Sequence, residues 1–385
     1  MMRLKGTNFI SILLTSHCMQ TSSFIPLLTY CHRGATIRMP FSTRSKYSII
    51  HSSRNILPLE RPPDPSSKHS NDATEAALQL RNWMQNKKAI LCLTGAGMST
   101  ESGIPDYRGH KGSYFNGHKP IVHHEFMTSE SARKRYWARS IVGYSPFANA
   151  KPNAGHVALA SLEEKGFIGV QVTHDNYKKT ISTITQNVDI LHSKGGMNHV
   201  LHLHGKGNIV RCMECGITKD RTEYHDELLE WNQQWIDRIS QRSVKDTDDS
   251  ELRPDGDAEL QIDSYDEFTL PGCKTCGESD VIKTDVVFFG DSIPRDRVDL
   301  ANAAVDAADG LLCIGTSLAV HSAFRLAKRA VQNGVPVAIL NVGKTRAEKE
   351  QLDVKKIESP IGETLVELVK ILESTESNVY KSKLV

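Results

Sequence analysis

Short apolar runs alternate with amphipathic stretches along most of the chain. The runs typical of buried strands lie at residues 89–94, 168–173, 310–314 and 335–340. The stretches with helical spacing of apolar positions lie at residues 74–86, 153–165, 322–333 and 362–373. Alternation of this kind predicts an α/β fold built on a Rossmann-like, doubly wound parallel sheet.

The alternation breaks in the middle of the chain. Residues 207–284 contain four of the eight cysteines and a polar, acidic stretch. We predict that this segment is a smaller zinc-binding lobe, inserted into a large domain made of residues 71–206 and 285–375. A short tail, 376–385, would follow.

Charge separates the first part of the chain from the rest. The whole chain has 385 residues with 47 Lys and Arg against 45 Asp and Glu, but residues 1–59 contain seven basic residues and no acid. A basic, Ser- and Thr-rich, acid-free start is typical of a mitochondrial transit peptide, so we expect residues 1–70 to be a leader and linker for import into the matrix. A secretory signal with an apolar core at residues 9–14 and a plain tail are the alternatives. No apolar run is long enough for a membrane span, and no basic, aromatic-rich stripe indicates nucleic-acid binding.

The four clustered cysteines form two C-x-x-C pairs. One motif contains Cys212 and Cys215 and the other contains Cys273 and Cys276, and a glycine follows each motif. Two such knuckles suit tetrahedral Zn²⁺, whereas disulfides or a redox C-x-x-C are the alternatives. Four protein ligands leave no open coordination position, so we expect one structural Zn²⁺ that takes no part in catalysis.

Polar and glycine-rich segments follow the predicted strands. Residues 95–97 form a G-x-G turn, in which backbone N–H groups can approach a pyrophosphate. Further polar segments occur at residues 186–189, 315–317 and 341–343. The carboxyl ends of parallel strands are where α/β sheets bind ligands.

The segments 94–99, 102–108, 185–189, 203–205, 315–317 and 341–343 together resemble the sirtuin family of NAD-dependent protein deacylases, in family order. The resemblance spans about residues 75–372. Residues 99–108, 135–139, 253–257 and 285–291 are similar to its class II mitochondrial branch.

The resemblance implies a role for each matching residue. His204 would be the general base, assisted by Asn187 and Asp189, and an imidazole with an ordinary pKa of about 6.5 suits that task. The substrate backbone would pair, as an added strand, with Val286, Val287, Phe288, Phe289 and Gly290. NAD, the co-substrate, would be held by Gly95, Ala96, Gly97, Thr100, Asp106, Tyr107, Arg108, Gln186, Asn187, Val188, Asp189, Gly315, Thr316, Ser317, Asn341, Val342, Gly343 and Ile361.

The implied reaction removes acyl groups, such as acetyl or lipoyl groups, from lysines of mitochondrial metabolic enzymes. Its products would be nicotinamide, an O-acyl-ADP-ribose and free lysine. Transfer of ADP-ribose to a protein is a second possible activity, and a weakened, sirtuin-like scaffold that binds partner proteins is the non-catalytic alternative. Tyr136 and Arg139 form a Y-x-x-R motif that related sirtuins use for acidic acyl groups, which predicts glutaryl-type substrates.

One segment departs from the family pattern. About twelve extra residues, around 174–184, precede the Gln186 motif. Residues 172–173 and 180–185 therefore compete to be the strand that presents Gln186.

Overall fold

The computed structural model describes residues 72–382, except 111, 117–119, 175–176, 244–252, 259, 261, 263 and 278–279. These residues belong to one unit, residues 53–385. The predicted leader at residues 1–70 lies outside the described residues.

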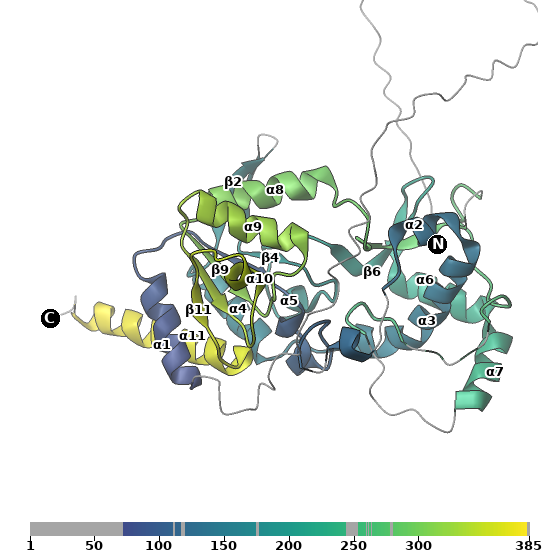
Figure 1. Cartoon of the computed structure of the whole chain (residues 1–385), viewed down its shortest axis with the longest axis horizontal. Helices are drawn as coiled ribbons and strands as arrows, with labels where there is room; N and C mark the ends of the chain where they lie inside the picture. Colours follow the sequence, from purple (N-terminus) through teal and green to yellow (C-terminus); the bar gives the residue numbers. More distant parts are fainter. Residues whose placement is uncertain are drawn as a thin grey trace, which may run out of the picture. The chain divides into compact units, whose positions relative to one another are not determined.

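A six-stranded parallel sheet forms the centre of the larger lobe (Figure 1). The strand order is β11-β10-β9-β1-β4-β5, and all neighbours pair in parallel. These strands are β1 (Ile90–Thr94), β4 (Thr183–Thr185), β5 (Val200–His202), β9 (Gly310–Ile314), β10 (Val337–Leu340) and β11 (Lys355–Ile357). The predicted Rossmann-like sheet is confirmed, and β1, β9 and β10 are three of its four predicted strands.

The fourth prediction, a parallel strand at residues 168–173, is wrong. β2 (Val170–His174) pairs antiparallel with β3 (Tyr177–Ile181) in a separate two-stranded ribbon. Val170 and Val172 are buried while Gln171 and Thr173 are exposed, which is the alternation of a half-buried ribbon. The extra residues thus form a hairpin, and β4 is the strand that leads into Gln186.

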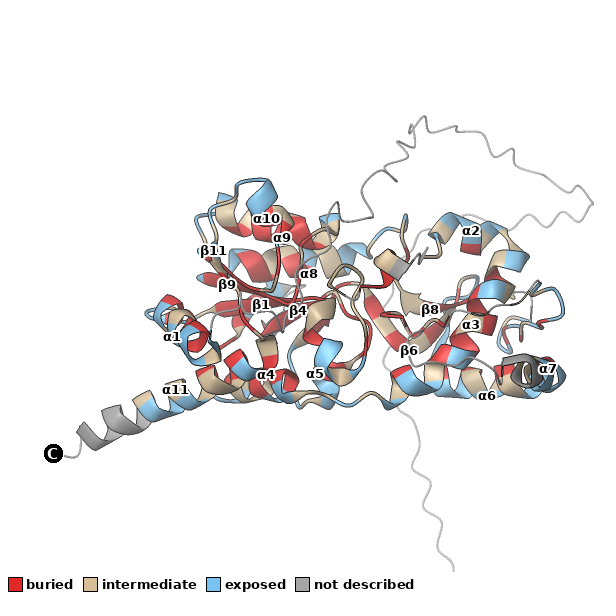
Figure 2. Cartoon of the chain, turned by 60° about the horizontal axis from the view of Figure 1, so that its bottom comes forward, coloured by how far each residue is buried: buried red, intermediate tan, exposed pale blue. Residues whose placement is uncertain are grey.

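Helices cover both faces of the main sheet, whose strands are largely buried (Figure 2). One face packs against α1 (Ala73–Met84), α4 (Ala154–Glu164) and α11 (Ile361–Ser382), and the other against α8 (Arg295–Asp306) and α9 (His321–Gln332). The short helices α5 (Leu191–Lys194) and α10 (Arg346–Lys349) lie in the connections. Successive residues of β1 serve opposite faces, since Leu91 and Leu93 pack on the α8–α9 side and Ile90 and Cys92 on the other. No described helix has the length and apolar composition that a membrane crossing requires.

The smaller lobe has its own sheet and its own core. Its antiparallel strands are ordered β7-β6-β8, namely β7 (Thr218–Asp220), β6 (Gly205–Cys212) and β8 (Ile282–Val286). Its helices are α2 (His123–Thr128), α3 (Glu130–Asn149), α6 (Arg221–Trp231) and α7 (Gln233–Ser243). Phe126 and Trp137 pack with Val210, Tyr224 and Phe268 in this core. Helices α2 and α3, which the predicted division places in the large domain, therefore contribute to the core of the small lobe.

Candidate active site

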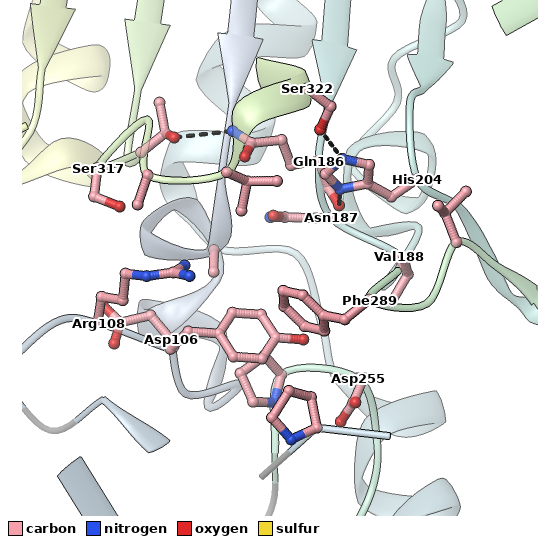
Figure 3. Close-up of a pocket in the computed structure, with 18 of the residues that line it drawn as sticks. Asp106, Arg108, Gln186, Asn187, Val188, His204, Asp255, Phe289, Ser317 and Ser322 are labelled. Carbon is pink, nitrogen blue, oxygen red and sulfur yellow. Dashed lines mark hydrogen bonds between the residues drawn. The ribbon is translucent and has the colours of Figure 1, made fainter. Parts of the chain in front are cut away.

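A cavity of about 740 Å³ lies where β1, β4, β9 and β10 end (Figure 3). Its lining includes residues 186–189, 315–317 and 341–342, which directly follow strands of the sheet. Residues 286–291 and Asp255 come to the same cavity from the small-lobe side of the chain. The cavity therefore lies between the carboxyl ends of the main-sheet strands and the end of β8 in the small-lobe sheet, and the first of these is where the predicted ligand site was expected.

The turn after β1 packs its backbone directly against the turn after β9. Gly97 N–H donates to the carbonyl of Gly315 at 2.9 Å. A Cβ on Gly95 would lie 2.7 Å from Cβ of Thr316 and 2.8 Å from the oxygen of Gly315. Gly315 itself has a φ of +60°. Only glycines permit this close approach, which leaves Ala96 and Gly97 on the cavity wall.

A buried polar network joins the β1 turn to the segment after β4. The side-chain amide of Asn187 donates to Gly95 O at 3.0 Å and to Ser99 Oγ at 3.1 Å. Ser99 Oγ donates in turn to Asp189 Oδ2 at 2.6 Å, and Leu191 N–H donates to Asp189 Oδ1 at 2.9 Å. Burial raises the pKa of Asp189, while these two donors oppose the rise. The network fixes Asn187 and Asp189 at the cavity, and sequence reasoning did not identify Ser99 as its connecting residue.

His204 is held at both ring nitrogens. Nδ1 lies 3.0 Å from the carbonyl oxygen of Gln186, and Nε2 lies 2.8 Å from Ser322 Oγ (Figure 3). A carbonyl can only accept, so Nδ1 carries the proton and Nε2 accepts from the serine hydroxyl. Burial lowers the pKa of His204 to about 4, although the Gln186 bond opposes this. The imidazole is therefore neutral at pH 7, with its basic nitrogen on the side of Ser322.

Asp106, Tyr107 and Arg108 lie on the loop after η2 (Thr100–Ser102) and line the cavity. Asp106 Oδ1 accepts from Gly109 N–H at 2.8 Å, and the guanidinium of Arg108 stacks on the ring of Tyr114 at 4.9 Å. Burial raises the pKa of Asp106 and lowers that of Arg108. This loop places a partly desolvated cation at the cavity, where an anionic ligand group would be favoured.

The structure brings most predicted site residues to the cavity wall. Those that line it are Ala96, Gly97, Asp106, Tyr107, Arg108, Gln186, Asn187, Val188, Asp189, His204, Val286, Val287, Phe288, Phe289, Gly290, Gly315, Thr316, Ser317, Asn341 and Val342. Gly95, Thr100, Gly343 and Ile361 are not part of the lining. Thr100 instead donates its hydroxyl to Gly97 O at 3.0 Å, behind the turn. The binding roles of the lining residues remain predictions.

The structure does not bring Tyr136 and Arg139 to the cavity. Tyr136 is buried in the small-lobe core, with its hydroxyl 2.8 Å from Thr284 Oγ1. Arg139 forms a two-pronged ion pair with Asp257, with Nε 3.0 Å from Oδ1 and Nη2 2.9 Å from Oδ2. Its Nε also lies 3.0 Å from the oxygen of Ala258. Because both side chains are engaged within the lobe, the expectation that they hold an acidic acyl group is corrected.

Asp255 and Ser322 line the cavity although sequence reasoning gave neither a role. Burial raises the pKa of Asp255. In the sequence, its segment at residues 253–257 indicated only a similarity to the class II branch. Ser322 carries no signal in the sequence, because its contact with His204 spans 118 positions of the chain.

The four lobe cysteines form one cluster. Their sulfur atoms all lie within 4.8 Å of one another, with Cys212 and Cys276 at 3.9 Å and Cys215 and Cys273 at 3.7 Å. A tetrahedral Zn²⁺ with Zn–S bonds of about 2.3 Å requires sulfur atoms about 3.8 Å apart. A disulfide would need about 2.05 Å. The cluster therefore fits a structural Zn²⁺ held by four thiolates, and the cavity lining does not include these cysteines.

Comparison with known proteins points to one family. The Sir2 family model matches residues 95–322, more than half of the chain. The chain is 39% identical to the NAD-dependent protein deacylase Sirt4 of Drosophila melanogaster, over 75% of this chain and 85% of that protein. It is 40% identical to NAD-dependent protein deacetylase 2 of Bradyrhizobium diazoefficiens, over 72% of this chain and 92% of that protein.

Solved structures agree with these matches. A structure described as the structural basis for the mechanism and regulation of Sir2 enzymes aligns with a TM-score of 0.56 at 28% identity. It covers 77% of this chain and 99% of its own. A mutant Sir2 homologue in complex with ADP-ribose aligns with a TM-score of 0.57 at 26% identity, covering 78% of this chain and 97% of its own.

Proposed function

The chain belongs to the Sir2 family and is an NAD-dependent protein deacylase, and from this premise we propose that it deacylates lysines of mitochondrial metabolic enzymes, with His204 as the base. The observation that carries this assignment is the neutral imidazole at the cavity, beside the buried Asn187–Ser99–Asp189 network. The lining of the same cavity also has backbone and a cation suited to the phosphates of NAD.

The residues present fit NAD. The close approach of the Gly95–Gly97 turn to Gly315 leaves backbone at the wall where a pyrophosphate can approach, and Arg108 supplies a cation. Bound NAD supplies an electrophilic ribose carbon and nicotinamide as the leaving group. Asn187 and Asp189 follow Gln186, whose side-chain amide donates to Thr94 O at the end of β1 at 3.3 Å and to Thr316 Oγ1 after β9 at 2.9 Å. We assign these side chains to positioning the ribose and the nicotinamide.

His204 would take the proton of a ribose hydroxyl at Nε2. Nδ1 cannot serve, because its proton is held by the carbonyl of Gln186. Ser322 occupies Nε2 and must yield this position when the hydroxyl arrives. The pKa of about 4 keeps the ring in its basic form throughout the neutral range.

Residues 286–290 would receive the substrate backbone. β8 is an edge strand of its sheet, and the chain continues from it along the cavity wall. Val287 N–H donates to the carbonyl of His204 at 2.9 Å, which ties this segment to the base. An extended peptide added along this edge would place its lysine next to His204.

The test is release of nicotinamide by purified protein with NAD and a panel of acetyl-, lipoyl-, glutaryl- and unmodified lysine peptides. We expect release with at least one acylated peptide, none with the unmodified peptide, and loss of release in His204→Tyr. If the wild type releases nothing with any peptide, or if His204→Tyr keeps every cellular effect of the protein, the scaffold alternative replaces catalysis.

We also propose that residues 1–59 direct the protein to the mitochondrial matrix. The support is compositional, namely seven basic residues without an acid. A fusion of residues 1–70 to a fluorescent protein should accumulate in mitochondria, and a version with the seven basic residues changed to Gln should not. Uptake of both fusions, or of neither, would contradict this assignment.

A further inference from the structure

Arg325 is a cavity-wall arginine for which the described part of the chain supplies neither a hydrogen bond nor an ion pair. Arg325, on α9, lines the cavity and is partly buried. Its Nε is fully buried without a hydrogen-bond partner, and within the described part of the chain no carboxylate forms an ion pair with it. Burying a guanidinium nitrogen without a hydrogen-bond acceptor costs free energy. A bound ligand that supplies the acceptor would remove this cost.

The four acids that line the same wall already have contacts of their own. Asp255 Oδ1 accepts from Asp257 N–H at 3.4 Å. Asp189 accepts from Ser99 and Leu191, and Asp106 accepts from the backbone of Gly109. Asp291 lies 3.2 Å from Nδ1 of His123. None of these carboxylates is directed to Arg325, so the missing acceptor belongs to a ligand.

The position of Arg325 indicates which ligand. Arg325 follows Ser322 by three residues, and residues at this spacing share one face of a helix. Ser322 contacts the base, so Arg325 lies about one turn along α9 from the residue that meets His204. α8 packs beside α9 (Figure 1). Val298 of α8 belongs to the cavity lining, and so do Ser292 and Ile293, which follow residues 286–290 in the chain. The phosphate-binding features, the Gly95–Gly97 turn and Arg108, come from other elements.

We propose that Arg325 is the receptor for a carboxylate carried by the acylated substrate. The inference rests on the proposed deacylase function and assigns to Arg325 the selectivity that the sequence pattern suggested for Arg139. Two sources carry this chemistry: the distal carboxylate of a dicarboxylic acyl group, and an acidic side chain next to the acyl-lysine. A guanidinium binds either with charge-assisted hydrogen bonds.

Four peptides of one sequence separate these sources. Two carry glutaryl-lysine or pentanoyl-lysine, which have equal chain length and differ in the terminal carboxylate. Two carry acetyl-lysine with Glu or Gln at the neighbouring position. In one pair the wild type should favour the charged member in kcat/KM by about 10- to 100-fold, the range for hydrogen bonds between charged groups. The pair that shows the preference identifies the source.

Arg325→Leu should abolish that preference and leave the uncharged peptides within about 2-fold, and Arg325→Lys should keep part of it. Arg295→Leu is the matched control, because Arg295 lines the same cavity but is 94% exposed and already lies 3.5 Å from Asp299. It should keep the wild-type preference. Absence of any preference in the wild type, or its survival in Arg325→Leu, overturns the proposal. So does a rise in KM for NAD with all four peptides, because Arg325 would then serve the cofactor.

Calorimetric binding of the four peptides to wild-type protein separates this inference from the proposed function. Preferential binding of a charged peptide without nicotinamide release supports the receptor and contradicts the deacylase assignment. Nicotinamide release without any charge preference supports the deacylase assignment and contradicts the receptor. Binding of none of the peptides overturns the receptor.

Discussion

Replacing Arg139 with Met should destabilise the small lobe and leave acyl selectivity unchanged. Arg139 and Asp257 are 11% and 13% exposed and share two contacts of 3.0 and 2.9 Å. At a pH where Asp257 is ionised, removing one partner of such a buried pair costs about 3–5 kcal/mol, because the other charge remains desolvated. Arg253 lies 3.6 Å from the same carboxylate and remains as a partial partner, which favours the lower end, about 3 kcal/mol. For a protein of this size, Tm should fall by roughly 5–10 °C.

The loss should also depend on pH. Burial and the neighbouring Asp255 raise the pKa of Asp257 to about 7, while Arg139 lowers it. Without Arg139 this pKa rises further, so the carboxyl is protonated over most of the neutral range. The deficit in stability should therefore be larger at pH 8.5 than at pH 6, where a proton replaces the missing cation.

Thermal unfolding at the two pH values, with acetyl- and glutaryl-lysine kinetics on the same variants, provides the measurement. Arg135→Met is the matched control on α3, because Arg135 and Glu125 are 46% and 56% exposed at 3.6 Å, and it should cost less than about 1 kcal/mol. An unchanged Tm in Arg139→Met, together with a lost glutaryl preference, would refute this reasoning and return Arg139 to the acyl site.

Three further predictions concern the cavity and the cluster. Gly95→Ala should reduce kcat/KM for NAD by at least about 10-fold, because its Cβ would lie 2.7 Å from Cβ of Thr316; an unaffected KM and kcat would show that the turns can separate. Activity should persist on acidification until the pH approaches 4, because the base form of His204 exists above its folded-state pKa; a kcat/KM profile that instead falls with a midpoint near 6.5 would contradict the buried, neutral ring. Purified protein should contain one zinc per chain by metal analysis, and Cys212→Ser should lower both zinc content and Tm, with Cys92→Ser keeping the metal. Full zinc occupancy in Cys212→Ser would contradict the four-cysteine site.

Local patterns identified the parts of the site that lie on short segments. The G-x-G turn, the segment at residues 186–189 and the two C-x-x-C pairs are recognisable because their chemistry depends on spacings of a few residues. The buried strands β1, β9 and β10 were predictable for the same reason, since their continuous apolar runs reflect burial on both faces.

The hairpin marks where pattern alone was insufficient. Residues 168–173 are nearly as apolar as a parallel strand, but the sheet takes residues 183–185 instead. The choice depends on which segment can pair with both β1 and β5. These strands are far apart in the chain, so a local apolar pattern cannot predict the choice. Similarly, helix α3 follows the large-domain segments in the chain but packs into the small-lobe core.

The sequence by itself determined the class of fold, the two C-x-x-C pairs and the glycine-rich turns that reach the cavity, because each depends on residues close together in the chain. Only the tertiary structure decided the state of individual charges. It paired Arg139 with Asp257 and placed Ser322 in contact with His204. It also left Arg325 Nε at the cavity without a hydrogen-bond partner among the described residues. Those outcomes depend on which side chains from distant segments meet away from water, and desolvation has large energetic effects that the order of residues does not reveal.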